Sequence, residues 1–163
     1  EFLIENQNLK VRFEFCGMGP LEPKLKAIVE KYPNLVKFNG YISNEKISDF
    51  YKKNDVYLFT SRSEPFPRVL MEALASNELI ICSKTIGSNE LLNGQKFAFF
   101  IEDLTSELIK EKILEIYNLW NSKPEEFKQL QVSAKNFVFE NYSFSKELEM
   151  FKELIDKIIR NNY

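Results

Sequence analysis

Two glutamates separated by seven residues carry the clearest chemical signal in the sequence. Glu64 lies in a polar loop, and Glu72 lies on the helix expected to follow, with Pro67 at its first position. At a rise of about 1.5 Å per residue, Glu72 stands roughly 7.5 Å further along the helix axis than Pro67. The free N–H groups of the first helical turn lie between the two carboxylates and attract anions. The pattern fits a ligand with hydroxyls at both ends and phosphate in the middle, such as a nucleotide-sugar.

Each glutamate alone also has a simpler interpretation. On this alternative, Glu64 caps the helix and Glu72 lies on a solvated helix face. The spacing of the two residues, the polar loop and the Glu-Ala-Leu-Ala run at 72–75 favour the ligand site over the alternative.

Alternating strands and helices are expected to hold these glutamates in place. Five strands are predicted from apolar runs, at residues 10–16, 35–39, 55–59, 79–83 and 97–101. This alternation predicts an α/β fold with a doubly wound, Rossmann-like parallel sheet flanked by helices. We expect one domain over residues 1–163, in which 1–9 form a helix end and a turn and 121–163 form C-terminal helices.

Capping residues and prolines mark where the helices begin. Ser and Thr side chains accept hydrogen bonds from the first amides of a helix, and proline is tolerated in the first turn. These signals predict helix starts at Pro23, Ser43, Ser88 or Asn89, Thr105 and Pro124.

Further motifs occur in the order and spacing of a known family. They read Phe-Cys-Gly-Met-Gly-Pro at 15–20, Val-Lys-Phe-Asn-Gly-Tyr at 36–41, Ile-Ile-Cys-Ser at 80–83 and Gly-Ser-Asn-Glu-Leu-Leu at 87–92. With the two glutamates, these motifs cover roughly residues 10–120. The sequence resembles the C-terminal donor-binding domain of the retaining GT-B glycosyltransferases of family 4, the glycosyl transferases group 1.

The resemblance implies a role for each part of the site. Glu64 is the implied catalytic residue and holds hexose hydroxyls near the anomeric carbon, whereas Glu72 holds the ribose hydroxyls. The loop at 17–20 lies at the cleft between domains, the loop at 40–42 lies against the base, and the helix start and loop 87–91 stabilise the diphosphate. The expected substrate-binding residues besides Glu72 are Gly17, Gly19, Tyr41, Ile42, Phe66, Arg68, Val69, Ser88 and Glu90.

The same resemblance implies the reaction and its partners. A hexose moves with retention from a nucleoside-diphosphate sugar to a glycan or lipid-linked acceptor, as in polysaccharide biosynthesis, without a metal or another cofactor. The acceptor-binding N-terminal domain, a central first strand, and the Arg and Lys that clamp the diphosphate are expected to precede residue 1. The strands at 10–16 and 55–59 should flank the place of that first strand, and either pair directly or accept another segment between them. We expect this part alone to bind donor but barely turn over.

The sequence departs from the family pattern in two places. Pro65 and Pro67 replace glycines, and each removes one backbone donor from the anion site. The amides of 66 and 68–70 remain, and Arg62 and Arg68 supply positive charge. Asn77-Glu78 replaces the usual Gly-x-Pro. These changes leave the donor sugar open.

Composition excludes several other classes of protein. The 163 residues contain no histidine, which rules out a Ser-His-Asp triad, a Cys-His pair and His-ligated zinc. A net charge of −2 argues against nucleic-acid binding. No apolar run reaches the length of a membrane-spanning helix, so we expect a cytoplasmic domain, with the whole enzyme peripheral at the inner face of the membrane. Cys16 and Cys82 are expected to be small buried residues in a reducing compartment.

Two alternatives to the glycosyltransferase remain open at this point. One is a sugar-nucleotide epimerase of the same fold, and the other is a non-catalytic nucleotide-binding or interaction module. NAD binding is disfavoured because Gly17-Met18-Gly19-Pro20 lacks the third glycine at the required offset.

Overall fold

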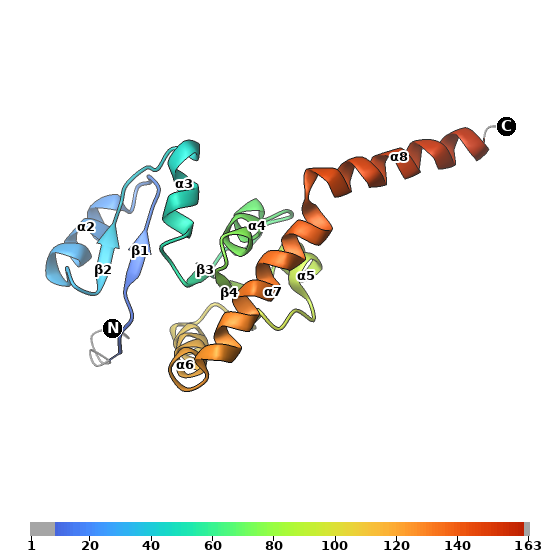
Figure 1. The fold of residues 1–163 in the computed structure, drawn as a ribbon. Helices are drawn as coiled ribbons and strands as arrows, with labels where there is room; N and C mark the ends of the chain where they lie inside the picture. Colours follow the sequence, from blue (N-terminus) through green and yellow to red (C-terminus); the bar gives the residue numbers. More distant parts are fainter. Residues whose placement is uncertain (1–8, 162–163) are drawn as a thin grey trace. The chain divides into compact units, whose positions relative to one another are not determined.

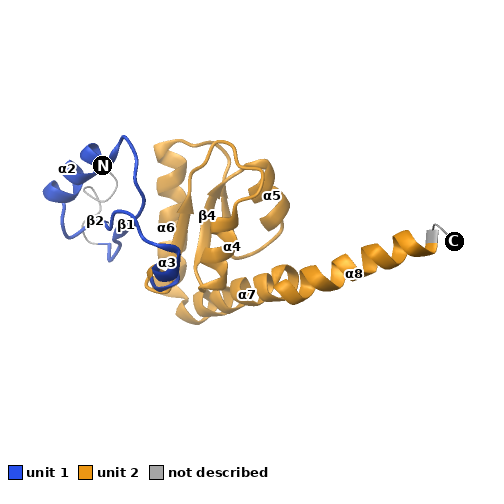
Figure 2. Ribbon diagram, turned by 90° about the horizontal axis from the view of Figure 1, so that it is seen from above, with its two compact units in different colours: residues 1–49 blue, residues 50–163 orange. Residues whose placement is uncertain are grey.

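The computed structural model describes residues 9–161, so the helix end and turn expected at 1–9 lie almost entirely outside the described residues. The chain divides into two compact units, residues 1–49 and residues 50–163 (Figure 2).

The first unit is built on a pair of parallel strands. Strand β1 (Phe13–Phe15) pairs with β2 (Val36–Phe38), with Phe13 opposite Val36. Helix α2 (Glu22–Lys31) connects them and packs against β2, and a proline lies in its first turn as predicted. Helix α3 (Asn44–Tyr51) begins directly after the expected cap, Ser43, and runs into the second unit.

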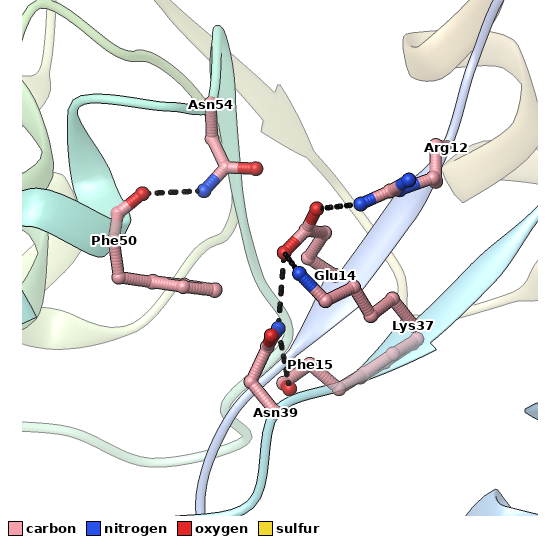
Figure 3. Close-up of polar contacts among 7 residues, drawn as sticks. All are labelled: Arg12, Glu14, Phe15, Lys37, Asn39, Phe50 and Asn54. Carbon is pink, nitrogen blue, oxygen red and sulfur yellow. Dashed lines mark hydrogen bonds and ion pairs between the residues drawn. The ribbon is translucent and has the colours of Figure 1, made fainter. Parts of the chain in front are cut away.

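One face of this strand pair is polar. Glu14 forms ion pairs with Arg12 and, at 3.5 Å, with Lys37, and accepts a hydrogen bond from Asn39 Nδ2 at 3.0 Å (Figure 3). Burial raises the pKa of the Glu14 carboxyl, but the hydrogen bonds from Arg12 and Asn39 and the nearby positive charges outweigh this effect and hold the pKa below its usual value. The cluster explains how a half-buried carboxylate is tolerated in a three-residue strand.

The second unit contains a three-stranded parallel sheet in the order β3-β4-β5. Val56 lies opposite Leu79, and Ile80 lies opposite Ala98. The elements are β3 (Val56–Phe59), α4 (Arg68–Ala75), β4 (Leu79–Ser83), α5 (Ile86–Leu92), β5 (Ala98–Ile101), α6 (Ser106–Ser122), α7 (Pro124–Tyr142) and α8 (Phe144–Asn161) (Figure 1).

The core of this unit lies around the central strand. All five residues of β4 are buried, which is expected for the middle strand of a parallel sheet covered on its faces. Leu70, Ala73 and Leu74 of α4 are completely buried, and α7 packs against α4 and against β4. Burying a Leu side chain contributes about 1.5–3 kcal/mol, so α4 is held firmly. The parallel strands and the helices packed against them confirm the predicted α/β fold.

Helix α8 projects away from the sheet of this unit in both views (Figures 1 and 2). It has an apolar stripe that remains exposed, which includes Phe144, Phe151 and Ile158. In the described part of the chain, no helix is both long and apolar enough to cross a membrane.

The structure differs from two expectations about the strands and cysteines. The described strands form two sheets, so β1 and β3 do not pair directly, and no described segment pairs with the second edge of either strand. The place of a first strand between them stays a prediction. Each strand pairs only with neighbours reached by a short crossover through one helix. Cys16 is exposed because it follows the last residue of β1, whereas Cys82, inside β4, is buried as predicted. Burial raises the pKa of the Cys82 thiol to about 12.

Candidate functional site

The loop between β3 and α4 leaves the sheet at the carboxyl ends of its strands, the edge at which open α/β sheets bind ligands. Ser83, the last residue of β4, ties this loop to the sheet. Its hydroxyl donates to the carbonyl oxygen of Ser61 at 2.5 Å and lies 3.4 Å from that of Phe59. The start of the loop is therefore fixed by a buried side chain.

Gly87 holds the middle of the loop. Its N–H donates to the carbonyl oxygen of Glu64 at 3.0 Å. A Cβ atom at position 87 would lie 2.5 Å from the Pro65 carbonyl oxygen and 2.6 Å from Pro67 Cδ. Only glycine permits this approach, so the first turn of α5 and the loop that carries Glu64 are packed backbone to backbone.

We expect Gly87→Ala to lower the free energy of unfolding by about 1–3 kcal/mol, because overpacking against backbone atoms cannot be relieved by a side-chain rotation. Urea unfolding of the two proteins measures the change. Gly19→Ala is the matched control, because a Cβ at position 19 meets nothing within 4 Å and the backbone φ there is not positive. Equal losses for the two variants would contradict the close approach at Gly87.

Glu64 is half-buried and uses one of its two carboxylate oxygens within the loop. Its Oε1 accepts a hydrogen bond from the Phe66 N–H at 3.2 Å. For Oε2, residues 9–161 provide no donor. The interpretation of Glu64 as a helix cap is wrong, because no side chain caps α4 and the Phe66 N–H lies before its first residue. One oxygen of Glu64 instead orders the loop, and the other stays available to a ligand.

Glu72 lies on the exposed side of α4 and also keeps one oxygen available. The Tyr51 hydroxyl donates to Glu72 Oε2 at 3.1 Å, and no described residue donates to Oε1. Tyr51 was not among the residues expected at the site. A signal for it exists, because a tyrosine at a core position of a helix needs a partner for its buried hydroxyl.

The first turn of α4 offers fewer free amides than the sequence suggests. The helix begins at Arg68, one residue later than expected, and Pro67 is its N-cap. The Arg68 N–H donates to the Phe66 carbonyl and the Leu70 N–H to the Pro67 carbonyl, both at 3.0 Å. Among the amides of 66 and 68–70, only that of Val69 has no partner in the described part of the chain. The exposed Arg68 side chain forms no ion pair with residues 9–161.

The cap of α5 is Thr85, and the expectation that Ser88 or Asn89 caps this helix is wrong. Thr85 and Ser88 form a reciprocal capping box, in which the Thr85 hydroxyl accepts from the Ser88 N–H at 3.1 Å and the Ser88 hydroxyl accepts from the Thr85 N–H at 2.8 Å. Ser88 is completely buried. The amides of Gly87, Ser88 and Asn89 all donate within the protein. Glu90, one turn into α5, is exposed.

The other candidate residues lie at the ends of β1 and β2 in the first unit. The Gly17 N–H donates to the Gly40 carbonyl at 2.7 Å, and both glycines have positive φ, 125° and 65°. This bond joins the loop that carries Gly17 and Gly19 to the loop that carries Tyr41 and Ile42. Tyr41 is 66% exposed, which leaves its ring free to stack on a base.

The structure thus brings together Glu64, Phe66, Arg68, Val69 and Glu72 around the start of α4, with α5 beside their loop. No group of three or more acidic or cysteine side chains within residues 9–161 is arranged to hold a metal ion.

The family model for glycosyl transferases group 1 matches residues 3–135. The chain belongs to this family. It is 28% identical to the glycogen synthase of Acholeplasma laidlawii over 169 aligned residues, which cover 98% of the chain and 34% of that enzyme. The chain spans only 34–38% of the length of its first curated relatives.

Two solved structures show the same GT-B fold. The catalytic domain of starch synthase IV from Arabidopsis thaliana, bound to ADP and acarbose, has a TM-score of 0.76 at 15% identity, with 95% of this chain and 34% of that chain covered. The HepE protein of Anabaena, in complex with UDP and glucose, has a TM-score of 0.72 at 18% identity, with 96% of this chain and 44% of that chain covered.

Proposed function

We propose that this chain is the donor-binding part of a retaining glycosyltransferase. The whole protein moves a hexose from a nucleoside-diphosphate sugar to a glycan or lipid-linked acceptor. The observation that carries the proposal is the pair Glu64 and Glu72, which flank the start of α4 at the carboxyl edge of the sheet. Each keeps one carboxylate oxygen to which no described residue donates. Membership of the glycosyl transferases group 1 supports it.

The nucleotide is bound from the helix side of the site. Glu72 accepts hydrogen bonds from the ribose hydroxyls through its available oxygen, as a carboxylate does for paired hydroxyls. The diphosphate lies at the N-terminus of α4, where the Val69 amide and the Arg68 guanidinium supply positive charge. The neighbour structures with ADP and with UDP and glucose support a nucleotide and a sugar as ligands.

The hexose is bound from the loop side. Glu64 accepts hydroxyls of the sugar through Oε2, while its other oxygen keeps the loop closed. As the bond to the sugar breaks, positive charge develops at the anomeric carbon and negative charge on the diphosphate. A preorganised carboxylate and helix N-terminus stabilise these charges without reorganisation. Gly87 and Ser83 act as positioning residues because they fix the loop that presents Glu64.

The ligand class has a direct test in calorimetric titration of the whole protein with UDP, GDP, ADP, the matching monophosphates and NAD. We expect one nucleoside diphosphate to bind more tightly than its monophosphate, because the helix N-terminus favours the added charge by about 0.3–1 kcal/mol, or roughly two- to fivefold in affinity. Equal affinity for the two, or no saturable binding to any nucleotide, would count against the proposal.

A further inference from the structure

We propose that Tyr51 is a positioning residue for the nucleotide, because it fixes the Glu72 carboxylate that binds the ribose. The inference rests on the proposed function and adds a residue from outside the glutamate motif. Its basis is the hydrogen bond from the Tyr51 hydroxyl to Glu72 Oε2, at 3.1 Å, which joins the end of α3 to the exposed side of α4.

Packing fixes the position of the Tyr51 hydroxyl. The residue is only 5% exposed and is the last residue of α3. Its ring centroid lies 5.9 Å from that of Tyr57 in β3 and 6.3 Å from that of Phe50. Ring pairs at these distances are held in defined orientations. The donor is therefore rigid, and removing its acceptor would disturb a buried polar group.

This rigid donor preorganises an otherwise mobile side chain. Glu72 is exposed, and a glutamate on a helix surface samples several rotamers. The bond to Tyr51 holds Oε2 and leaves Oε1 without a described partner, so one oxygen anchors the carboxylate and the other is presented to the ligand. A binding group that is already ordered loses less conformational entropy when the ligand arrives.

A double-mutant cycle on the whole protein tests the inference. The four proteins are wild type, Tyr51→Phe, Glu72→Gln and the double variant, each titrated with whichever of UDP, GDP or ADP binds the wild type most tightly. Phenylalanine keeps the ring and its packing and removes only the hydroxyl. We expect Tyr51→Phe to weaken nucleotide binding about fivefold, as for the loss of one net hydrogen bond. Its effect should be clearly smaller in the Glu72→Gln background, where no charged carboxylate is left for Tyr51 to orient.

Steady-state kinetics separate positioning from a general structural defect. Because the ribose contact is made equally in the ground state and the transition state, Tyr51→Phe should raise the KM for the nucleotide-sugar with kcat unchanged. Tyr117→Phe is the matched control, since Tyr117 lies on α6 with its ring against Trp120 and should leave affinity and KM unchanged.

The outcomes distinguish this inference from the function on which it rests. Unchanged affinity for Tyr51→Phe together with a loss for Glu72→Gln would overturn the role of Tyr51 and leave the proposed function in place. Additive losses in the double variant would also overturn it, because Tyr51 would then act independently of Glu72. No loss for Glu72→Gln would overturn the ribose site itself and the inference with it.

Discussion

Replacement of Glu64 by glutamine should lower the kcat of the whole enzyme by roughly 10- to 150-fold, the factor that corresponds to one charge-assisted hydrogen bond of about 1.5–3 kcal/mol. In the proposed site, the charge of Glu64 matters most when positive charge develops at the anomeric carbon. Glutamine keeps a carbonyl oxygen that can accept the Phe66 N–H, so the loop itself should remain closed. Affinity for the bare nucleoside diphosphate should therefore change little.

Initial rates with the nucleotide-sugar, together with calorimetry on the bare nucleotide, measure the two parts of this expectation. Glu107→Gln provides the control, because Glu107 is an exposed residue in the first turn of α6 and has no place in the proposed site. An unchanged kcat for Glu64→Gln would remove the residue from the chemistry. A loss of bare-nucleotide affinity as large as that expected for Glu72→Gln would contradict its place at the sugar.

The second large effect is a pH dependence of the free energy of unfolding, caused by a buried carboxyl outside the site. Glu78 directly precedes β4, is 1% exposed, and has an Oε1 atom without a partner in the described part of the chain. Burial, and secondarily the charge of Asp55, raise its pKa to about 8. The folded protein therefore binds this proton more tightly than the unfolded chain, whose glutamates titrate near 4.3.

The sign of the pH dependence follows from this difference. The stabilisation by the bound proton is fully present below the unfolded pKa and is lost as the pH rises to about 8. We expect the free energy of unfolding to fall with increasing pH, by up to about 1.4 kcal/mol per pH unit. Urea unfolding at several pH values between 5 and 9 measures the slope.

Glu78→Gln should remove this slope, because the amide does not titrate, and should make the variant relatively more stable at pH 8 than at pH 5. Glu107→Gln again serves as the exposed control. The same slope in wild type and Glu78→Gln would show that the buried carboxyl is not the source of the pH dependence.

Local sequence pattern determined most of the fold. The strand β4 was predictable from its apolar run, because burial on the two sides of a central strand leaves a strong signal. The starts of α6 at Thr105 and α7 at Pro124 were predictable because one side chain determines each of them. At α5 the signal was shared by Thr85 and Ser88, and only the three-dimensional structure shows which residue is the cap.

The features that the sequence could not supply depend on contacts between distant segments. Tyr51 and Glu72 are 21 residues apart, and their hydrogen bond exists only in the folded second unit, which contains both residues. The burial of Glu78 could not be predicted from the sequence either, because a glutamate next to a turn normally lies at the surface. Asn77 precedes it with a φ of 68°, a left-handed conformation that asparagine tolerates in place of the usual glycine.

The most direct measurement of the central claim is the affinity of the whole protein for its preferred nucleoside diphosphate in three forms: wild type, Glu72→Gln and Glu64→Gln. If Glu72 binds the ribose and Glu64 the hexose, Glu72→Gln should weaken binding roughly 10- to 150-fold through the lost charge-assisted hydrogen bond, and Glu64→Gln should leave it nearly unchanged. Wild-type affinity for Glu72→Gln, or equal losses for the two variants, would contradict the assignment of the two glutamates to the two ends of the donor.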